Sequence, residues 1–372
     1  MGNDKCKGEG AGLRSACRRP GGGLQARSIV KTRTISARHW KKALYALLLG
    51  LPILLFLPAL ALGRYGIGVL DVGRALLSPL RPELADGIPA IAQTLVLRVR
   101  LPRVLAAMLI GASMAGTGAA FQGLFKNPLV DSNILGVTSG AGFGAALALL
   151  LGGSPWQVQV SAFAFGLLAV SMAFWGSRLY KTAPMLILTL MGILVGSFFG
   201  SLTALIKIIA DPLDTLPAIT FWLLGGLTGV VWRDIPLLAA LTVGGSAFLW
   251  LIRWRLNVLS LGDAEATSLG INPGRLKLVI IVCATLMTAV AVSVGGVIGW
   301  VGLVIPHAGR ILVGPDHKRL IPVSLSLGAS FLLIIDNISR TLLAAEAPLG
   351  VLTGLIGVPL LIALLRRNRT GW

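Results

Sequence analysis

The sequence is poor in charge, and above all in acidic residues. Of its 372 residues 13% are charged, with 14 Asp and Glu against 33 Lys and Arg, whereas 55% are hydrophobic. The mean hydropathy is +0.84. No ordinary soluble domain combines so much apolar composition with so little charge. Because a hydrocarbon core about 30 Å thick takes roughly 20 apolar residues per helix, the composition predicts a chain that crosses a membrane many times.

Motifs for metal binding and for catalysis are also missing. Cys6, Cys17 and Cys283 show neither metal-ligand spacing nor a disulfide framework, and the three histidines form no HExxH motif. No glycine precedes a lysine anywhere, which excludes a phosphate loop of the GxxxxGK[ST] type. We therefore expect no metal site, no cofactor and no ATP hydrolysis by this chain itself.

Ten apolar segments predict transmembrane helices in an all-α polytopic membrane protein. Strands would show shorter segments of about ten alternating residues. A further stretch, TFWLLGGLTGVV at 220–231, is too short to cross, and we expect a re-entrant half-helix entering from the outer face, beside a translocation path. The ten segments are 43–62, 101–121, 134–151, 158–177, 184–206, 235–252, 277–294, 297–313, 320–343 and 349–365.

Basic residues cluster between these segments in a pattern that predicts the topology. With ten spans and a cytoplasmic N-terminus, every cluster falls on the cytoplasmic side, as the positive-inside rule requires. Both termini are then cytoplasmic. We expect the basic residues to contact lipid and not nucleic acid. The clusters are Arg178 and Lys181; Arg253, Arg255, Arg275 and Lys277; Arg310, Lys318 and Arg319; and Arg366, Arg367 and Arg369.

The chain divides by composition into a tail, a membrane domain and a short end. Residues 1–42 form a basic tail that we expect to be disordered and cytoplasmic, 43–367 the transmembrane domain, and 368–372 a cytoplasmic C-terminal end. The first apolar segment ends in Ala59-Leu60-Ala61, which also fits a signal-peptidase site. Cleavage there would leave nine spans. A retained helix is favoured because so long a basic tail suits a cytoplasmic anchor.

A polar interruption in the stretch QGLFKNPLVDSNILGVTSGAGFGA, residues 122–145, is followed by glycines four residues apart. Such glycines lie on one face of a helix and let neighbouring backbones approach closely in a membrane. The cytoplasmic loop 253–276 contains Asp263 and Glu265 followed by Gly270, which predicts a short helix closed by a glycine. The residues alone leave open whether this loop is a solvated connector or a docking element.

Ionisable residues within the spans are scarce. Asp336 is the only acidic candidate, and Arg340 stands four residues later on the same helix face, which predicts an internal ion pair. A transporter driven by a proton or sodium gradient would need carboxylates near the membrane midplane. The outer arginines Arg98, Arg100, Arg103 and Arg340 either anchor a partner's carboxylates or lie at the level of the lipid headgroups.

Seven stretches together resemble the permease family of binding-protein-dependent ABC importers for iron-siderophores, haem and cobalamin. The resemblance runs from about residue 45 to 367. One departure is Ser132, which stands where the family usually has a second proline. The stretches are RLPR at 100–103, QGLFKNPL at 122–129, LGVTSGAGFGA at 135–145, WLLGGLTGVVWRD at 222–234, GDAEATSLGI at 262–271, GWVGLVIPHAGRILVGPDHKRLIP at 299–322 and APLGVLTGLIGVPLLIALLRR at 347–367.

The resemblance implies a homodimer in the bacterial inner membrane with the path at its two-fold axis. It also implies two cytoplasmic ATPase subunits that bind ATP and Mg, and an extracytoplasmic substrate-binding protein. Roles for single residues follow from the matching positions. They are a cytoplasmic gate at Asn127, Pro128 and Leu129; coupling to the ATPase through Asp263, Glu265, Leu269 and Gly270; and docking of the binding protein on Arg100, Arg103 and Arg340.

The expected cargo is an iron chelate, either haem or a ferric siderophore, with cobalamin as the alternative. No residue distinguishes haem from siderophore. Two functions of other classes compete with an importer permease: a secondary transporter driven by an ion gradient, and a membrane receptor or scaffold that transports nothing. The first lacks midplane carboxylates, and the second would need neither a gate loop nor a capped cytoplasmic helix.

Overall fold

The computed structural model describes residues 23–63, 65–85, 87–180, 184–342 and 346–367, and every regular element in these ranges is a helix. Two compact units make up the chain, residues 1–46 and 47–372. Helix α1 (Gly23–Ala61) includes residues 23–42 of the predicted tail, so the predicted boundary at residue 43 is not a helix end. Residues 1–22 and 368–372 lie outside the described part of the chain.

Each of the ten predicted spans corresponds to a helix, which confirms the all-helical membrane fold. Eight helices in the described residues are long and apolar enough to cross a membrane, whereas α5 and α12 are shorter. The remaining nine of the ten helices, after α1, are α4 (Leu101–Leu124), α5 (Val137–Leu150), α6 (Pro155–Arg178), α7 (Pro184–Ile209), α9 (Ile235–Leu261), α11 (Pro273–Gly295), α12 (Val301–Val313), α13 (His317–Leu342) and α14 (Leu349–Arg367).

The second span begins earlier than predicted. After α2 (Val69–Leu77) and the short helix η1 (Pro82–Ala85), α3 (Ala90–Thr94) and the π-helical turn η2 (Leu95–Arg100) lead without a break into α4. A continuous helix therefore runs from Ala90 to Leu124. Pro102 cannot donate a hydrogen bond, and the wider π turn just before it accommodates this loss inside the helix.

The predicted half-helix is present but shifted along the chain. Helix α8 (Thr215–Leu224) starts five residues before the predicted range 220–231 and stops at Gly225. Gly225 has a φ of +73°, and a Cβ at this position would lie 2.6 Å from the carbonyl oxygen of Val297. The glycine thus ends the helix and allows a close approach of two backbones. Residues 225–231 form an irregular segment that ends in η3 (Trp232–Asp234).

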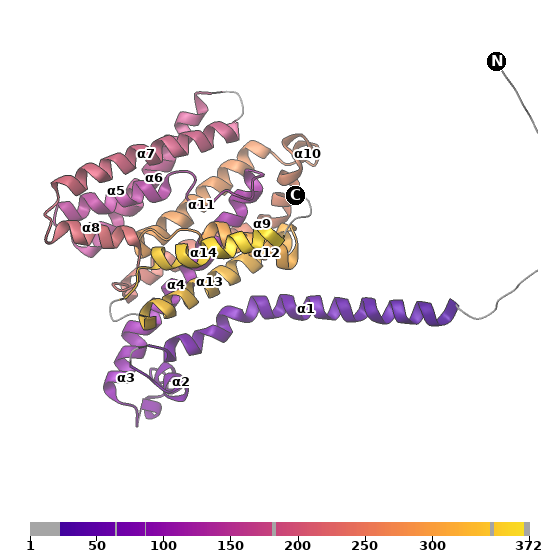
Figure 1. Cartoon of the computed structure of the whole chain (residues 1–372), viewed down its shortest axis with the longest axis horizontal. Helices are drawn as coiled ribbons and strands as arrows, with labels where there is room; N and C mark the ends of the chain where they lie inside the picture. Colours follow the sequence, from indigo (N-terminus) through magenta and orange to yellow (C-terminus); the bar gives the residue numbers. More distant parts are fainter. Residues whose placement is uncertain (1–22, 64, 86, 181–183, 343–345, 368–372) are drawn as a thin grey trace, which may run out of the picture. The chain divides into compact units, whose positions relative to one another are not determined.

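Helix α4 forms the centre of the second unit. Almost all its residues from Pro102 to Leu124 are buried, and it packs against α9, α11, α12 and α13. Figure 1 shows α4 and α13 side by side. At Gly111 the two backbones touch, because a Cβ there would overlap the carbonyl of Gly328, and Gly118 meets Gly302 of α12 in the same way. Without a hydrophobic drive between helices in lipid, such close contacts supply the packing energy.

The glycines four residues apart also mark close helix contacts, as predicted. Gly140 and Gly144 of α5 face carbonyls of Phe165 and Ser161 on α6, and Gly192 of α7 faces Ile134. Tight packing within the chain therefore explains these glycines.

The second unit has two ends, set by the direction of α4. A helix of 24 residues is about 36 Å long. Arg103 lies at its start, and Arg340 lies at the end of the antiparallel α13; we call this the arginine end. The opposite end, the loop end, holds residues 125–136 and α10 (Asp263–Ser268). Arg178, Arg275, Lys318 and Arg366, one residue from each predicted basic cluster, lie at helix termini of the loop end, whereas Lys181 and Arg369 lie outside the described residues.

Candidate functional site

At the arginine end, Arg100 caps the end of α1. Its guanidinium donates to the carbonyl oxygens of Leu60 at 2.7 Å, Ala61 at 3.0 Å and Tyr65 at 2.5 Å. The last carbonyls of a helix have no partner within the helix, and a cation satisfies them well. Arg100 is 4% exposed. Its position follows from the π turn, which places it against α1.

A buried charge cluster lies beside it and joins α4 to α13. Arg103 Nε is 2.8 Å from Asp336 Oδ1, and Arg340 Nε is 3.1 Å from Asp336 Oδ2. Arg340 also donates to the carbonyl of Ala59 at 3.1 Å. The predicted ion pair between Asp336 and Arg340 is thus confirmed. The structure adds Arg103 as a second partner from 233 residues away.

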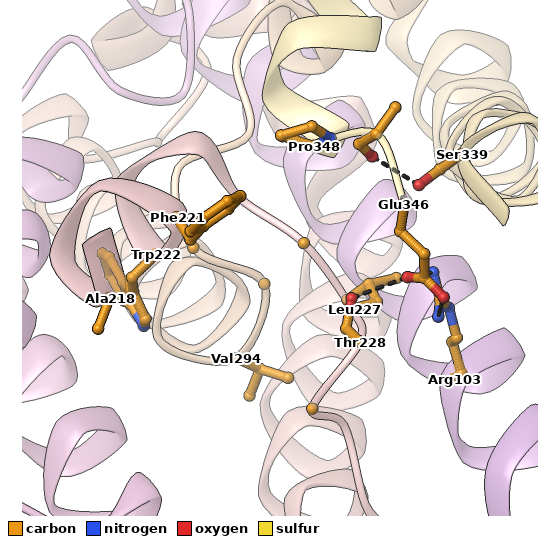
Figure 2. Close-up of a pocket in the computed structure, with 16 residues that line it drawn as sticks. Arg103, Ala218, Phe221, Trp222, Leu227, Thr228, Val294, Ser339, Glu346 and Pro348 are labelled. Atoms are coloured by element: carbon orange, nitrogen blue, oxygen red, sulfur yellow. Dashed lines mark hydrogen bonds and ion pairs between the residues drawn. The ribbon is translucent and has the colours of Figure 1, made fainter. Parts of the chain in front are cut away.

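Glu346 extends the cluster towards an open cavity. Its carboxylate pairs with Arg103 at 2.9 Å and accepts a hydrogen bond from the Thr228 hydroxyl at 2.8 Å. Figure 2 shows Glu346 between Thr228 and Arg103, with Phe221 and Trp222 across the pocket. The cavity has a volume of about 300 Å³ and is lined by the end of α8, the loop 225–229, the turn 294–296 and the segment 346–348.

The three arginines assigned to docking are therefore engaged within the chain. Arg100, Arg103 and Arg340 are 4%, 6% and 7% exposed. The hydrogen bonds that these arginines donate to carbonyls and carboxylates stabilise the junction of α1, α4 and α13. Contact of these arginines with a binding protein stays a prediction. Glu346 lies between Arg103 and the cavity, and sequence reasoning missed this residue. Its signal in the sequence was its isolation as the one acidic residue after Asp336.

At the loop end, the residues of the predicted gate form a turn held by the Asn127 side chain and tied to α4 by the Asn127 backbone N–H, which donates to the Gln122 carbonyl. Asn127 Oδ1 accepts a hydrogen bond from the Leu129 backbone N–H at 2.9 Å, and Lys126 has a φ of +51°. Leu129 is 59% exposed. Pro128, between them, is half-buried. A large apolar side chain on an exposed turn is available to meet another surface or to block a passage.

The remainder of this loop is anchored on α12. Asp131 accepts hydrogen bonds from the Ser132 backbone N–H and from Asn133 Nδ2, at 2.7 and 2.9 Å. Burial raises the pKa of the Asp131 carboxyl, although these donors act in the opposite direction. A Cβ at Gly302 would overlap the Asp131 carboxylate. One half of the loop is therefore fixed, and Lys126 to Leu129 form its exposed half.

The short helix predicted in the loop 253–276 is present as α10. Asp263 is its first residue and pairs with Lys277 of α11 at 2.6 Å, while Ala266 of the same helix is buried. Leu269 is 56% exposed, and Gly270 closes the helix with a φ of +75°. Glu265 is also exposed. The prediction of a short helix closed by a glycine is confirmed, and its exposed face can serve as a docking element.

Three residues between α9 and α13 were missed by sequence reasoning. Asn257, Asp316 and His317 form a hydrogen-bonded group at the loop end that joins α9 to α13. A lone asparagine near the end of an apolar helix was their only signal. Among the described residues, no group of three or more His, Cys, Asp or Glu could hold a metal ion.

A bundle of helices that are long and apolar enough to cross a membrane defines a multi-pass membrane protein. The pattern of the FecCD transport family matches residues 48–367. The chain belongs to this family and is an ABC importer permease.

Relatives of the chain carry different cargoes. It is 37% identical over 328 residues to the molybdate import system permease protein of Haemophilus influenzae, covering 87% of this chain and 96% of the relative. It is 40% identical over 276 residues to a protein of Helicobacter pylori named as an iron chelatin transport system permease, covering 74% and 83%. A solved structure described as an inward-facing conformation of a metal-chelate type ABC transporter matches with a TM-score of 0.78 at 36% identity, covering 88% of this chain and 99% of that one.

Proposed function

We propose that the chain moves an iron chelate, either haem or a ferric siderophore, inward across the bacterial inner membrane by ATP-driven alternating access. It acts as a homodimer with two cytoplasmic ATPase subunits, which bind ATP and Mg, and with an extracytoplasmic binding protein. The loop end faces the cytoplasm, since the basic residues at the helix termini gather there.

Helix α10 is the observation that carries this proposal. It is anchored by the Asp263–Lys277 pair and by buried Ala266, and it presents Leu269 and Glu265 outwards. A short helix that packs through Ala266 and exposes an apolar side chain suits a groove on a partner subunit. One residue, Gly262, separates it from α9, so a push on α10 reaches a transmembrane helix directly.

Iron chelates are favoured by the relative named for an iron chelatin and by the metal-chelate type structural neighbour. Cobalamin is the alternative, and the relative named for molybdate adds a third cargo to test. A secondary transporter driven by an ion gradient is disfavoured, because the one acidic residue found away from the ends of a described span, Asp336, is neutralised by two arginines.

Transport in proteoliposomes tests the proposal. The chain is reconstituted with its ATPase, and uptake of haem, a ferric siderophore, cobalamin and molybdate is followed with and without the binding protein. We expect uptake of an iron chelate that needs both ATP and the binding protein. Uptake of molybdate or cobalamin alone would correct the cargo, whereas uptake driven by a proton or sodium gradient without the ATPase would refute the importer mechanism.

A further inference from the structure

A single amide side chain ties the end of α9 to the start of α13. Asn257 Nδ2 donates to Asp316 Oδ1 at 2.6 Å, and its Oδ1 accepts from the His317 backbone N–H at 2.8 Å. The same Oδ1 lies 2.9 Å from His317 Nδ1. Because a carboxylate only accepts and a backbone N–H only donates, the orientation of the amide is unambiguous.

The imidazole of His317 continues the contact to α4. Nδ1 donates to Asn257, so Nε2 carries no hydrogen in the neutral ring. Nε2 is buried and has no hydrogen-bond partner among the described residues. It lies against Gly123 in the last turn of α4, where a Cβ would overlap Nε2. The ring therefore rests directly on the α4 backbone, at a distance that only glycine permits.

These contacts join the two functional elements of the loop end. Asn257 stands five residues before Gly262, which leads into α10, and Gly123 stands two residues before the loop 125–136. Packed elements of this kind shift as units, since a close-packed interior does not absorb displacement gradually. A movement of α10 that carries the end of α9 with it would displace His317 and press on the end of α4.

Capping of α13 does not by itself account for Asn257. Asp316 already caps this helix, because its Oδ1 accepts from the Lys318 backbone N–H at 2.9 Å. The additional role of Asn257 is to hold this cap against a different helix. A further tie, from Arg253 to the carbonyl of Lys318, is 3.4 Å long and more exposed.

We propose that Asn257 and His317 are positioning residues that transmit the displacement of α10 to the gate turn at Asn127 and Leu129. This inference rests on the proposed function, in which α10 receives the movement of the ATPase. This role requires no contact of either residue with cargo or ATP. Their contribution is the mechanical coupling between the two elements.

The test uses the full complex in proteoliposomes, with the three native cysteines replaced and a reporter cysteine at Leu129. Cargo uptake, ATP hydrolysis and maleimide labelling of Leu129→Cys are measured with and without ATP and vanadate. In Asn257→Leu we expect uptake per ATP to fall about tenfold while hydrolysis changes by less than about twofold. The nucleotide-dependent change in labelling should disappear. Asn257→Gln, which keeps the amide, should restore part of the coupling.

Two controls separate transmission from stability. Ser154→Ala removes a helix cap at the arginine end, where Ser154 bonds Gln157, and should leave the labelling change intact. Asn257→Ser, which is polar but too short to reach Asp316, replaces Asn257→Leu if the latter does not assemble. A reporter at Ser268→Cys on α10 should respond to nucleotide in every variant.

The outcomes distinguish the two proposals. If Leu129→Cys does not respond to nucleotide even with Asn257 present, the gate assigned under the proposed function is wrong. If it responds equally with Asn257 in place, in Asn257→Leu and in Asn257→Ser, the gate stands and the link through Asn257 and His317 is refuted.

Discussion

The two ends of the helical bundle solve the problem of polar groups in opposite ways. At the arginine end, Arg100, Arg103 and Arg340 are buried and satisfied by carbonyls of α1 and by the carboxylate of Asp336 on α13. At the loop end, Asn127 and Leu129 lie on an exposed turn that is held by the Asn127 side chain and a backbone hydrogen bond to Gln122. The first arrangement is expensive to disturb, and the second can shift at little cost.

This difference indicates which end stays fixed during a transport cycle. Breaking a buried charge pair costs about 3–5 kcal/mol, whereas the exposed turn has few buried contacts to lose, so the junction of α1, α4 and α13 should move less than the loop end. The loop end combines a short helix, a glycine with positive φ and an exposed turn. Elements with few buried contacts are the ones that proteins move.

The largest effect should come from removing Asp336. Asp336→Leu leaves Arg103 and Arg340 buried without their shared carboxylate, whose side chain is fully buried. A loss of one partner from a buried pair costs about 3–5 kcal/mol, so the variant should give little monodisperse protein. Yield and melting temperature in detergent measure this.

The control for Asp336 is the same change at the loop end. Asp263 pairs with Lys277 while half-exposed, and such pairs contribute about 0–1 kcal/mol. Asp263→Leu should therefore be purified in normal amounts. Equal yields of the two variants would show that the ends do not differ in rigidity as argued.

The Asp336 cluster also shows how far sequence reasoning reaches. Long apolar runs predict spans because each helix must satisfy its backbone locally, and all ten were found. The Asp336–Arg340 pair was predictable since both residues lie on one helix turn. Arg103 was assigned to an exposed face, because its partners Asp336 and Glu346 are 233 and 243 positions away. Only tertiary structure shows that burial.

The predicted boundaries of two helices differ from the structure for a related reason. The stretch around Leu101 is rich in arginine and contains Pro102, which suggests a loop, yet a π turn continues the helix back to Ala90. The end of α8 at Gly225 depends on the approach of Val297, a contact with no local signature. By contrast, the short helix closed by Gly270 was predictable, because capping is encoded in neighbouring residues.

The next effect concerns function without loss of fold. Gly270 has a φ of +75° and open space around it, so Gly270→Ala strains only the backbone, by about 1–2 kcal/mol. The end of α10 should reorient, and we expect uptake to fall about tenfold with normal protein yield. The control is Gly274→Ala. Gly274 lies four residues further along the chain and has no positive φ, so this variant should transport normally. Matching losses in both variants would argue against a special role for Gly270.

A smaller effect tests whether Arg103 takes part in docking of the binding protein at the arginine end. If a binding-protein carboxylate competes with Glu346 for Arg103, Glu346→Gln should raise affinity for the binding protein by about fivefold, the equivalent of a weak ion pair. Surface plasmon resonance on nanodiscs measures it. Glu83→Gln removes the same charge from an exposed position on η1 and should change affinity little. Unchanged affinity in Glu346→Gln would mean that docking does not use Arg103.

The smallest effect is a pH dependence of the same carboxylate. Partial burial acts to raise the pKa of Glu346, but the hydrogen bond and charge of Arg103 outweigh it and hold the pKa below the ordinary value of 4.5. A lowered pKa in the folded state gives stabilisation that is complete above pH 4.5 and is lost as pH falls through the folded value. The difference in melting temperature between the native chain and Glu346→Gln should therefore be constant from neutral pH down to that point. It should shrink only at lower pH, and a difference that already declines near pH 6 would mean that another group controls this end of the bundle.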